Sequence, residues 1–167
     1  MSDLSTPARI TRGIVAGAVA GAVASFAMDR FQAATSSLLP LSGDDEPATE
    51  QAADAVVKAA TGHKVPDAAK PLAGQSVHYA LGIGLGIAYG IAAEFRPSVT
   101  TGYGTAFGLG TATLLDEAAV PAVGLGDAPW KAPLSTTLYG YASHLVFGRI
   151  SEIVCRQVAG TLTKSAE

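Results

Sequence analysis

A long apolar stretch near the end of the chain, residues 133–156, most constrains how this sequence can fold. It reads PLSTTLYGYASHLVFGRISEIVCR and is long enough to cross a bilayer as a helix, which takes about 20 residues. His144 lies near its middle, and Arg149 and Glu152 follow. Ionisable side chains are costly in lipid unless they face a polar partner or a water-filled cavity. The stretch therefore predicts a helix that turns these three side chains towards the inside of a small membrane bundle.

The composition agrees with a membrane protein of one domain, covering residues 1–167. Of the 167 residues 49% are hydrophobic and only 15% are charged, whereas about 25% charged is usual for soluble domains. The net charge of -3 provides no basic surface for nucleic acid. Cys155 is the only cysteine, which excludes an intrachain disulfide and a cysteine-based metal cluster.

The apolar runs and the polar segments between them predict an all-α protein. We expect a four-helix transmembrane bundle with a short extracytoplasmic helix in the first loop, at residues 46–60, where Pro47 suits the start and Gly62 the end. An alternative for the first run is a cleaved signal peptide, because Ala22-Val23-Ala24 resembles a cleavage site. The four predicted spans are residues 12–34, 74–93, 99–117 and 132–155.

Glycines recur every fourth residue within the apolar runs. Positions four apart lie on the same face of a helix, and small residues there let transmembrane helices approach closely. The sequence therefore predicts tight helix packing through ten glycines. They are Gly13, Gly17, Gly21, Gly82, Gly86, Gly90, Gly104, Gly108, Gly140 and Gly148.

The distribution of lysine and arginine predicts how the chain is oriented. Positive residues favour the cytoplasmic side of a membrane, and there are more of them near the span ends on the side of the two termini. We therefore expect both termini in the cytoplasm, with the first loop and the loop around Trp130 outside. Trp130 is expected to anchor that loop at the membrane interface.

Counting residues along each span places the polar side chains at different depths. The outer layer holds a histidine and three carboxylates: Asp29, His78, Asp116 and Glu117. The inner layer holds Glu94, Arg149 and Glu152. His144 is expected between the two layers, roughly 10 Å below His78 at about 1.5 Å per residue.

Protonatable groups at successive depths are what a proton or small-solute path needs, because histidine titrates near neutral pH. We therefore predict such a path along His78, His144, Glu94 and Glu152, without enzymatic catalysis, cofactor or metal. Three other roles stay open at this point. The two histidines could ligate a haem iron, the four residues of the outer layer could form a metal site, or the polar groups could only fix helix packing.

Several short motifs in the second half of the chain resemble the YagU-like family. This resemblance covers residues 75–156 and implies a small bacterial inner-membrane protein with a domain of unknown function. It implies family positions at His78, Glu94, Pro97, Trp130, His144 and Glu152. The motifs are Ala88-Tyr89-Gly90, Ala93-Glu94-Phe95-Arg96-Pro97, Ala128-Pro129-Trp130, His144-Leu145-Val146-Phe147 and Glu152-Ile153-Val154.

A second functional hypothesis comes from the number of glycine faces, which exceeds what a four-helix core needs. Such faces could dock the chain onto a larger membrane complex, as an accessory or assembly subunit, or onto a second copy of itself. The expected partners are therefore the lipid bilayer and either a membrane-protein partner or a homo-oligomer, with no nucleic acid.

Overall fold

The computed structural model describes residues 5–36, 46–126 and 130–164, and within these ranges every regular element is helical. This confirms the predicted all-α class. Three short elements join the helices: the 3-10 turns η1 (Asp67–Ala69) and η2 (Pro97–Thr100), and the π-helical turn η3 (Leu115–Ala119). The α-helices are α1 (Thr6–Thr35), α2 (Ala48–Thr61), α3 (Lys70–Phe95), α4 (Thr105–Leu114), α5 (Val120–Ala122) and α6 (Leu134–Lys164).

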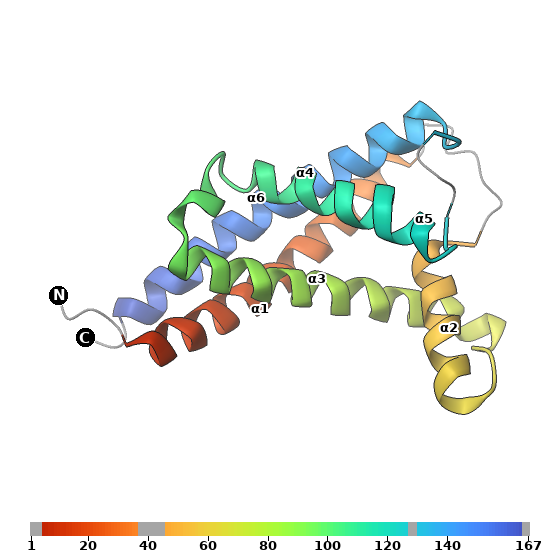
Figure 1. Cartoon of the computed structure of the whole chain (residues 1–167), viewed down its shortest axis with the longest axis horizontal. Coiled ribbons are helices and arrows are strands. Elements are labelled where there is room, and N and C mark those ends of the chain that lie inside the picture. The colour runs from red at the N-terminus through yellow and green to blue at the C-terminus, as the bar shows by residue number, and fades with distance from the viewer. Residues whose placement is uncertain (1–4, 37–45, 127–129, 165–167) are drawn as a thin grey trace.

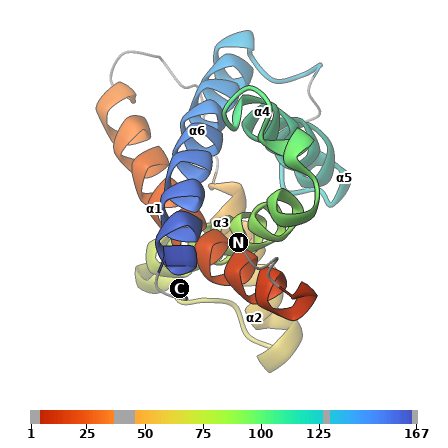
Figure 2. The same ribbon diagram turned by 90° about the vertical axis from the view of Figure 1, so that its left-hand side faces the viewer.

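Four helices run along the length of the molecule. α1 and α4 run in one direction, while α3 and α6 return in the other (Figure 1). α1 packs against both α3 and α6, and α6 also packs against α4. The start of α1 and the end of α6 lie at the same end of the molecule, and Figure 2 looks onto that end. α2 packs on α3 at the opposite end. We call α1 with α3 the first helix pair and α4 with α6 the second.

The first helix pair crosses through glycines on both helices. A methyl group added at Gly17 would collide with the backbone carbonyl of Gly86, and one added at Gly21 with that of Gly82. At Gly13 the added carbon would lie 2.8 Å from Ile91 Cα. Only glycine allows two helix backbones to come this close.

The second helix pair uses the same device at one crossing. A methyl group at Gly108 would meet the backbone carbonyl of His144, and one at Gly148 would lie 2.6 Å from the backbone nitrogen of Gly108. Gly104 has a φ of 81° and caps the start of α4.

The third span is predicted to begin at residue 99, which is too early. Pro97 starts η2, and the positive φ angles of Gly102 and Gly104 interrupt the helix before α4 begins.

The other predicted boundaries are close to the observed helices. The loop helix is α2, which ends as expected at Gly62 in the left-handed conformation. The last helix continues past residue 155 to Lys164, since its sequence contains no proline after Leu134.

The interior is made mainly of small and polar side chains, together with a few larger ones such as Met28, Tyr89 and Phe147. Ser25, Ser143 and Ser151 are the largest side chains that are fully buried. α1 exposes six large apolar side chains: Ile10, Ile14, Val15, Val19, Val23 and Phe26. It therefore turns most of its large apolar residues outwards, whereas the core of a soluble protein collects such residues.

Two helices are long and apolar enough to cross a membrane: Thr6–Thr35, with a mean hydropathy of 1.6, and Asp67–Phe95, with 1.4. A buried core helix of a soluble protein or a signal sequence also satisfies this criterion. Only 39% and 22% of the two apolar windows are buried inside the protein, so neither is a core helix of this chain. The described residues of the other two predicted spans do not meet the same criterion.

Candidate functional site

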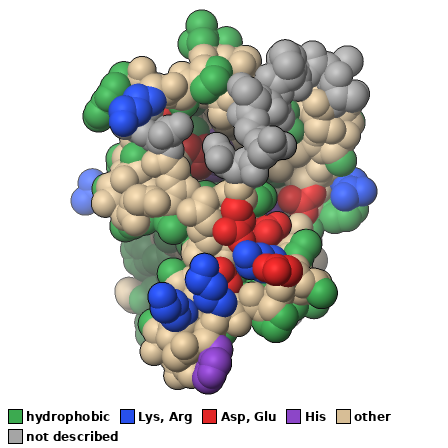
Figure 3. All heavy atoms as spheres, turned by 90° about the vertical axis from the view of Figure 1, so that its right-hand side faces the viewer, with side chains coloured by type: hydrophobic (Ala, Val, Ile, Leu, Met, Phe, Trp, Pro, Cys, Tyr) green, Lys and Arg blue, Asp and Glu red, His purple; other side chains and the backbone are tan. Residues whose placement is uncertain are grey.

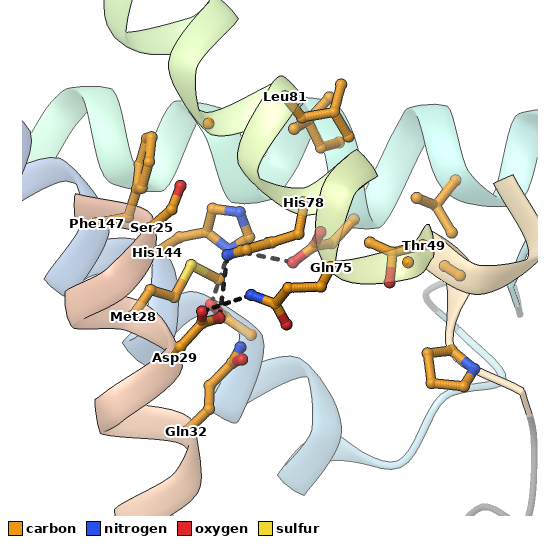
Figure 4. A pocket seen from close by; sticks show the side chains of 18 of the residues that line it. Ser25, Met28, Asp29, Gln32, Thr49, Gln75, His78, Leu81, His144 and Phe147 are labelled. Carbon is orange, nitrogen blue, oxygen red and sulfur yellow. Dashed lines mark hydrogen bonds and ion pairs between the residues drawn. The ribbon is translucent and has the colours of Figure 1, made fainter. Parts of the chain in front are cut away.

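A cleft of about 510 Å³ opens between the two helix pairs, at the end of the molecule where α2 lies. Its walls come from both pairs and from the first turn of α2. Figure 4 shows the lining side chains, with two histidines and Asp29 pointing into the cleft. Ligand sites commonly have volumes of about 300–1,000 Å³ and combine apolar walls with a few polar groups. The polar groups of this cleft are arranged mainly around two histidine–aspartate pairs.

The first pair joins α1 to α3. His78 Nε2 lies 3.2 Å from Asp29 Oδ1, and Gln75 donates a hydrogen bond of 2.7 Å to Asp29 Oδ2. His78 and Gln75 are three residues apart, so they lie on one face of α3. The approach of His78 to Asp29 is not a hydrogen bond, and Nε2 is buried without one among the described residues.

The second pair joins η3 to α6. His144 Nδ1 lies 3.2 Å from Asp116 Oδ2 and 3.1 Å from the backbone carbonyl of Gly140. Both neighbours accept hydrogen bonds, so Nδ1 carries the hydrogen. A carbon added at Gly140 would lie 3.2 Å from Asp116 Oδ2, so glycine leaves room for this carboxylate. Asp116 stands in a π-helical turn, and such turns often occur at functional sites.

The two aspartates occupy equivalent positions in the two helix pairs. The spacing Gly-x3-Gly-x7-Asp occurs in α1, as Gly17, Gly21 and Asp29, and again from the start of α4, as Gly104, Gly108 and Asp116. In each case the glycines contact the antiparallel helix of the pair, and that helix provides the histidine. The cleft therefore lies between two similar structural units, each with its own histidine–aspartate pair.

An aromatic cluster closes the deep end of the cleft. Phe147 lines the cleft, and its ring centroid lies 5.8 Å from that of Phe107. Phe107 stacks in turn on Tyr89, with centroids 4.4 Å apart. Since Tyr89 belongs to α3 and the two phenylalanines to α4 and α6, this cluster connects the first helix pair to the second.

Beyond the aromatic cluster lie two buried carboxylates, each paired with an arginine. Glu94 receives two hydrogen bonds from the guanidinium of Arg12, of 2.7 and 2.5 Å. Glu152 accepts a hydrogen bond of 2.6 Å from the Tyr89 hydroxyl and is also bonded by Arg156. Its side chain is only 3% exposed. These residues form a charged layer at the end of the molecule that carries the two termini.

The structure places some of the expected residues differently from the depth count. His144 pairs with Asp116 instead of lying between two layers, because α6 crosses the other helices obliquely while the count assumed parallel axes (Figure 1). Arg149 is exposed and lies over the ring of Tyr103, 5.8 Å from its centroid. It therefore does not pair with Glu94 or Glu152. Glu117 is half-buried and does not line the cleft.

Several residues of these two polar groups were not identified from the sequence, namely Arg12, Ser25, Glu50, Gln75, Tyr89 and Arg156. Arg12 was interpreted only as a membrane-flanking charge, although Glu94 lies at the matching end of an antiparallel helix. Gln75 could have been found from its three-residue spacing to His78. Tyr89 belongs to one of the motifs of the YagU-like resemblance, which assigns it no role, and nothing in the sequence distinguishes Ser25 from the other serines.

The geometry of the donor groups bears on the haem and metal alternatives. In the described part of the chain, no three side chains of histidine, cysteine, aspartate or glutamate are close enough to hold a metal ion. His78 and His144 each lie beside a carboxylate of their own helix pair. The glycine faces of α1 and α3 are occupied within the chain, because Gly17 and Gly21 pack against Gly86 and Gly82; docking onto a membrane partner or a second copy stays a prediction.

Comparisons with known proteins identify a family. A family model described as "Protein of unknown function (DUF1440)" matches residues 58–153. No curated protein and no solved structure matches the chain. The matched region contains His78, Asp116 and His144, whereas Asp29 on α1 lies outside it. Because the match covers more than half of the chain, this protein belongs to the DUF1440 family.

Proposed function

We propose that this protein is a membrane-embedded, proton-linked path for a small solute, with the cleft as its solute site. The observation that carries the proposal is the presence of two histidine–aspartate pairs in one cleft that is open at one end and closed by aromatic side chains at the other. Ionisable residues within membrane helices are expensive and usually functional.

The placement in a membrane is supported by the distribution of side chains. Large apolar residues on α1 face outwards, while serines, glycines and alanines fill the contacts between helices. In lipid, helices associate through such small residues and not through a hydrophobic core. We place α1, α3, α6 and the continuous segment formed by α4, η3 and α5 across a bilayer, with both termini in the cytoplasm; the bacterial inner membrane is proposed from the YagU-like resemblance.

The arrangement fits a site that is open to one side of the membrane at a time. A solute can enter the cleft beside α2, where His78 and His144 line the wall as candidate proton-binding groups. Passage to the other side requires the contacts among Tyr89, Phe107 and Phe147 to open. Because the glycine crossings hold the helices of each pair together, we propose that the opening motion shifts one pair against the other, with α1 and α6 staying in contact as the axis of the motion. Transporters with internal repeats work by such motions.

The test is a proton-flux assay on the full chain in sealed proteoliposomes that contain a pH-sensitive dye. A panel of small amines, carboxylates, amino acids and polyols is added outside, and the change in internal pH is recorded. At least one solute should drive a proton flux in the wild type. The flux should fall by at least about tenfold in His78→Gln and His144→Gln, because each substitution removes a proton-binding group.

His63→Gln is the matched control, since His63 lies exposed beyond the end of α2 and outside the cleft. Circular dichroism and size-exclusion chromatography establish that each variant is folded. If no solute moves protons, or if the folded His144→Gln protein transports as well as His63→Gln, the proposal is refuted.

A further inference from the structure

We infer that the cleft is selective for small organic ammonium ions, an inference that rests on the proposed function and names its class of solute. The cleft is lined by three carboxylates, those of Asp29, Glu50 and Asp116. No lysine or arginine lines it, and the residues outside the described ranges contain neither. Three carboxylates against two histidines leave the cleft negative even when both histidines are protonated, which attracts cations and repels anions.

The nearest cationic side chains are held elsewhere. Arg30 lies over the ring of Phe26, with 5.5 Å between its guanidinium carbon and the ring centroid. Lys70 is bound by Glu46 at 2.8 Å and by Asp67 at 3.1 Å. Figure 3 looks onto this end of the molecule and shows acidic side chains gathered near its centre. Neither of these two cations is therefore free to neutralise the carboxylates of the cleft.

A buried hydroxyl group shows that the wall of the cleft lacks a hydrogen-bond partner. Ser25 lines the cleft, its side chain is 0% exposed, and its hydroxyl oxygen has no partner among the described residues (Figure 4). Buried polar groups are nearly always paired in native proteins. Because this oxygen is fully buried against Gly82 in the crossing of α1 and α3, an N–H group or a water reaches it only when the two helices separate locally at the wall of the cleft.

The apolar part of the wall favours an organic cation over a metal ion. Met28, Leu81, Leu85 and Phe147 line the cleft, and the face of an aromatic ring attracts an ammonium group. A metal ion needs several oxygen ligands within about 2–2.6 Å, whereas no three acidic or histidine side chains among the described residues come together. Carboxylates spread around a cleft of about 510 Å³ instead suit a cation that carries a carbon skeleton.

Isothermal titration calorimetry with a set of compounds of equal length and different charge tests this inference. The purified full-length protein in mild detergent is titrated with n-butylammonium, butyrate and butanol, and separately with Mg²⁺. Only n-butylammonium should bind. Its affinity should fall by about tenfold or more in Asp29→Asn, because a charge-assisted hydrogen bond is lost.

Glu50→Gln provides a second variant, since it removes a charge from the cleft without affecting either histidine pair. It should also weaken binding, by about threefold to tenfold. Asp67→Asn is the matched control: it removes a carboxylate at the same end of the molecule that does not line the cleft. Its affinity for n-butylammonium should stay within about twofold of the wild type.

The inference is overturned if butyrate or butanol binds the wild type as tightly as n-butylammonium does. It is also overturned if Mg²⁺ binds the wild type but not Asp29→Asn, or if Asp29→Asn and Glu50→Gln both bind n-butylammonium as tightly as Asp67→Asn does. The proton-flux assay separates this result from failure of the proposed function. A flux that depends on His144 but is driven by an anion or a neutral solute would reject only the cation class. Binding of n-butylammonium without any flux would reject only the transport function.

Discussion

The two helix pairs share the spacing Gly-x3-Gly-x7-Asp but use it differently. In the first pair, glycines face glycines along much of the crossing of α1 and α3, and Asp29 is held by two side chains of α3. In the second, a single crossing is followed by a π-helical turn that carries Asp116 to His144. The first pair is therefore the more rigid framework, and the second provides the more adaptable side of the cleft.

The exposure of the four paired side chains reflects the same difference. Asp29 and His78 are similarly shielded, with 18% and 22% of their side chains exposed. Asp116 is 41% exposed while His144 is only 10% exposed. A buried carboxylate that joins two helices contributes to stability, whereas an exposed one contributes little. We therefore expect the first aspartate to matter for folding and binding, and the second mainly for function.

The largest expected effect comes from filling the glycine crossing of the first pair. Gly17→Ala should reduce the free energy of unfolding by about 3 kcal/mol, because the new methyl group meets the backbone of α3 and the helices must separate. Unfolding in a denaturing detergent, followed by circular dichroism, measures this. Gly108→Ala in the second pair should cost less, about 2 kcal/mol, since fewer close backbone contacts depend on it.

Gly84→Ala is the control for both variants, because no atom lies within 4 Å of the added carbon. It should leave stability unchanged or raise it by about 0.5–1 kcal/mol, the usual gain for alanine within a helix. Equal stabilities for the three variants would mean that the glycine crossings do not hold the pairs together.

The next effect compares the two aspartates. Asp29→Asn should lower the free energy of unfolding by about 2 kcal/mol, because Gln75 loses a charged acceptor and His78 loses a neighbouring carboxylate in a shielded site. Asp116→Asn should cost less than about 1 kcal/mol, as is usual for exposed ion pairs. The same unfolding assay measures both. A larger cost for Asp116→Asn would reverse the assignment of the rigid and the adaptable pair.

A smaller effect is expected where the two pairs meet. Tyr89→Phe keeps the ring that stacks on Phe107 but removes the hydrogen bond to Glu152. It should reduce stability by about 1 kcal/mol. Tyr103→Phe, on an exposed side chain, should change stability by less than about 0.5 kcal/mol. If the two variants behave alike, the Tyr89 hydroxyl does not contribute to joining the pairs.

The smallest effect on stability is expected at Ser25. The second pair has Ala112 at the equivalent position, four residues after its second glycine. Since the Ser25 hydroxyl has no partner, Ser25→Ala should change the free energy of unfolding by less than about 0.5 kcal/mol. Calorimetry on the same protein should show weaker binding of n-butylammonium. A marked loss of stability would reveal that the hydroxyl has a structural role.

Much of the framework was predictable from the sequence, because helical periodicity and glycine spacing are local features. The helix over residues 48–61 and its end at Gly62 follow from local capping patterns. The early start predicted for the third span shows the limit of this approach. Gly104 is predicted as a packing position inside an apolar run, although the positive φ angles of Gly102 and Gly104 break the helix there.

The candidate site was less predictable, because it depends on how helices cross. The sequence identified both histidines and both aspartates but could not show that they share one cleft. Arg149 was expected inside because it lies in the same apolar stretch as His144. At about 100° per residue, however, five positions turn it to a different face of the helix, where it is exposed.

The central claim is that the two helix pairs build a single proton-linked site, and a double-mutant cycle on the two histidines tests it most directly. Proton flux is measured in proteoliposomes for the wild type, His78→Gln, His144→Gln and the double variant, with the solute that drives the largest flux. Groups that act as one unit are not additive, so the double variant should be about as slow as the slower single variant. Losses that multiply in the double variant would mean that the histidines act at separate sites, and unchanged flux in all three variants would show that neither takes part.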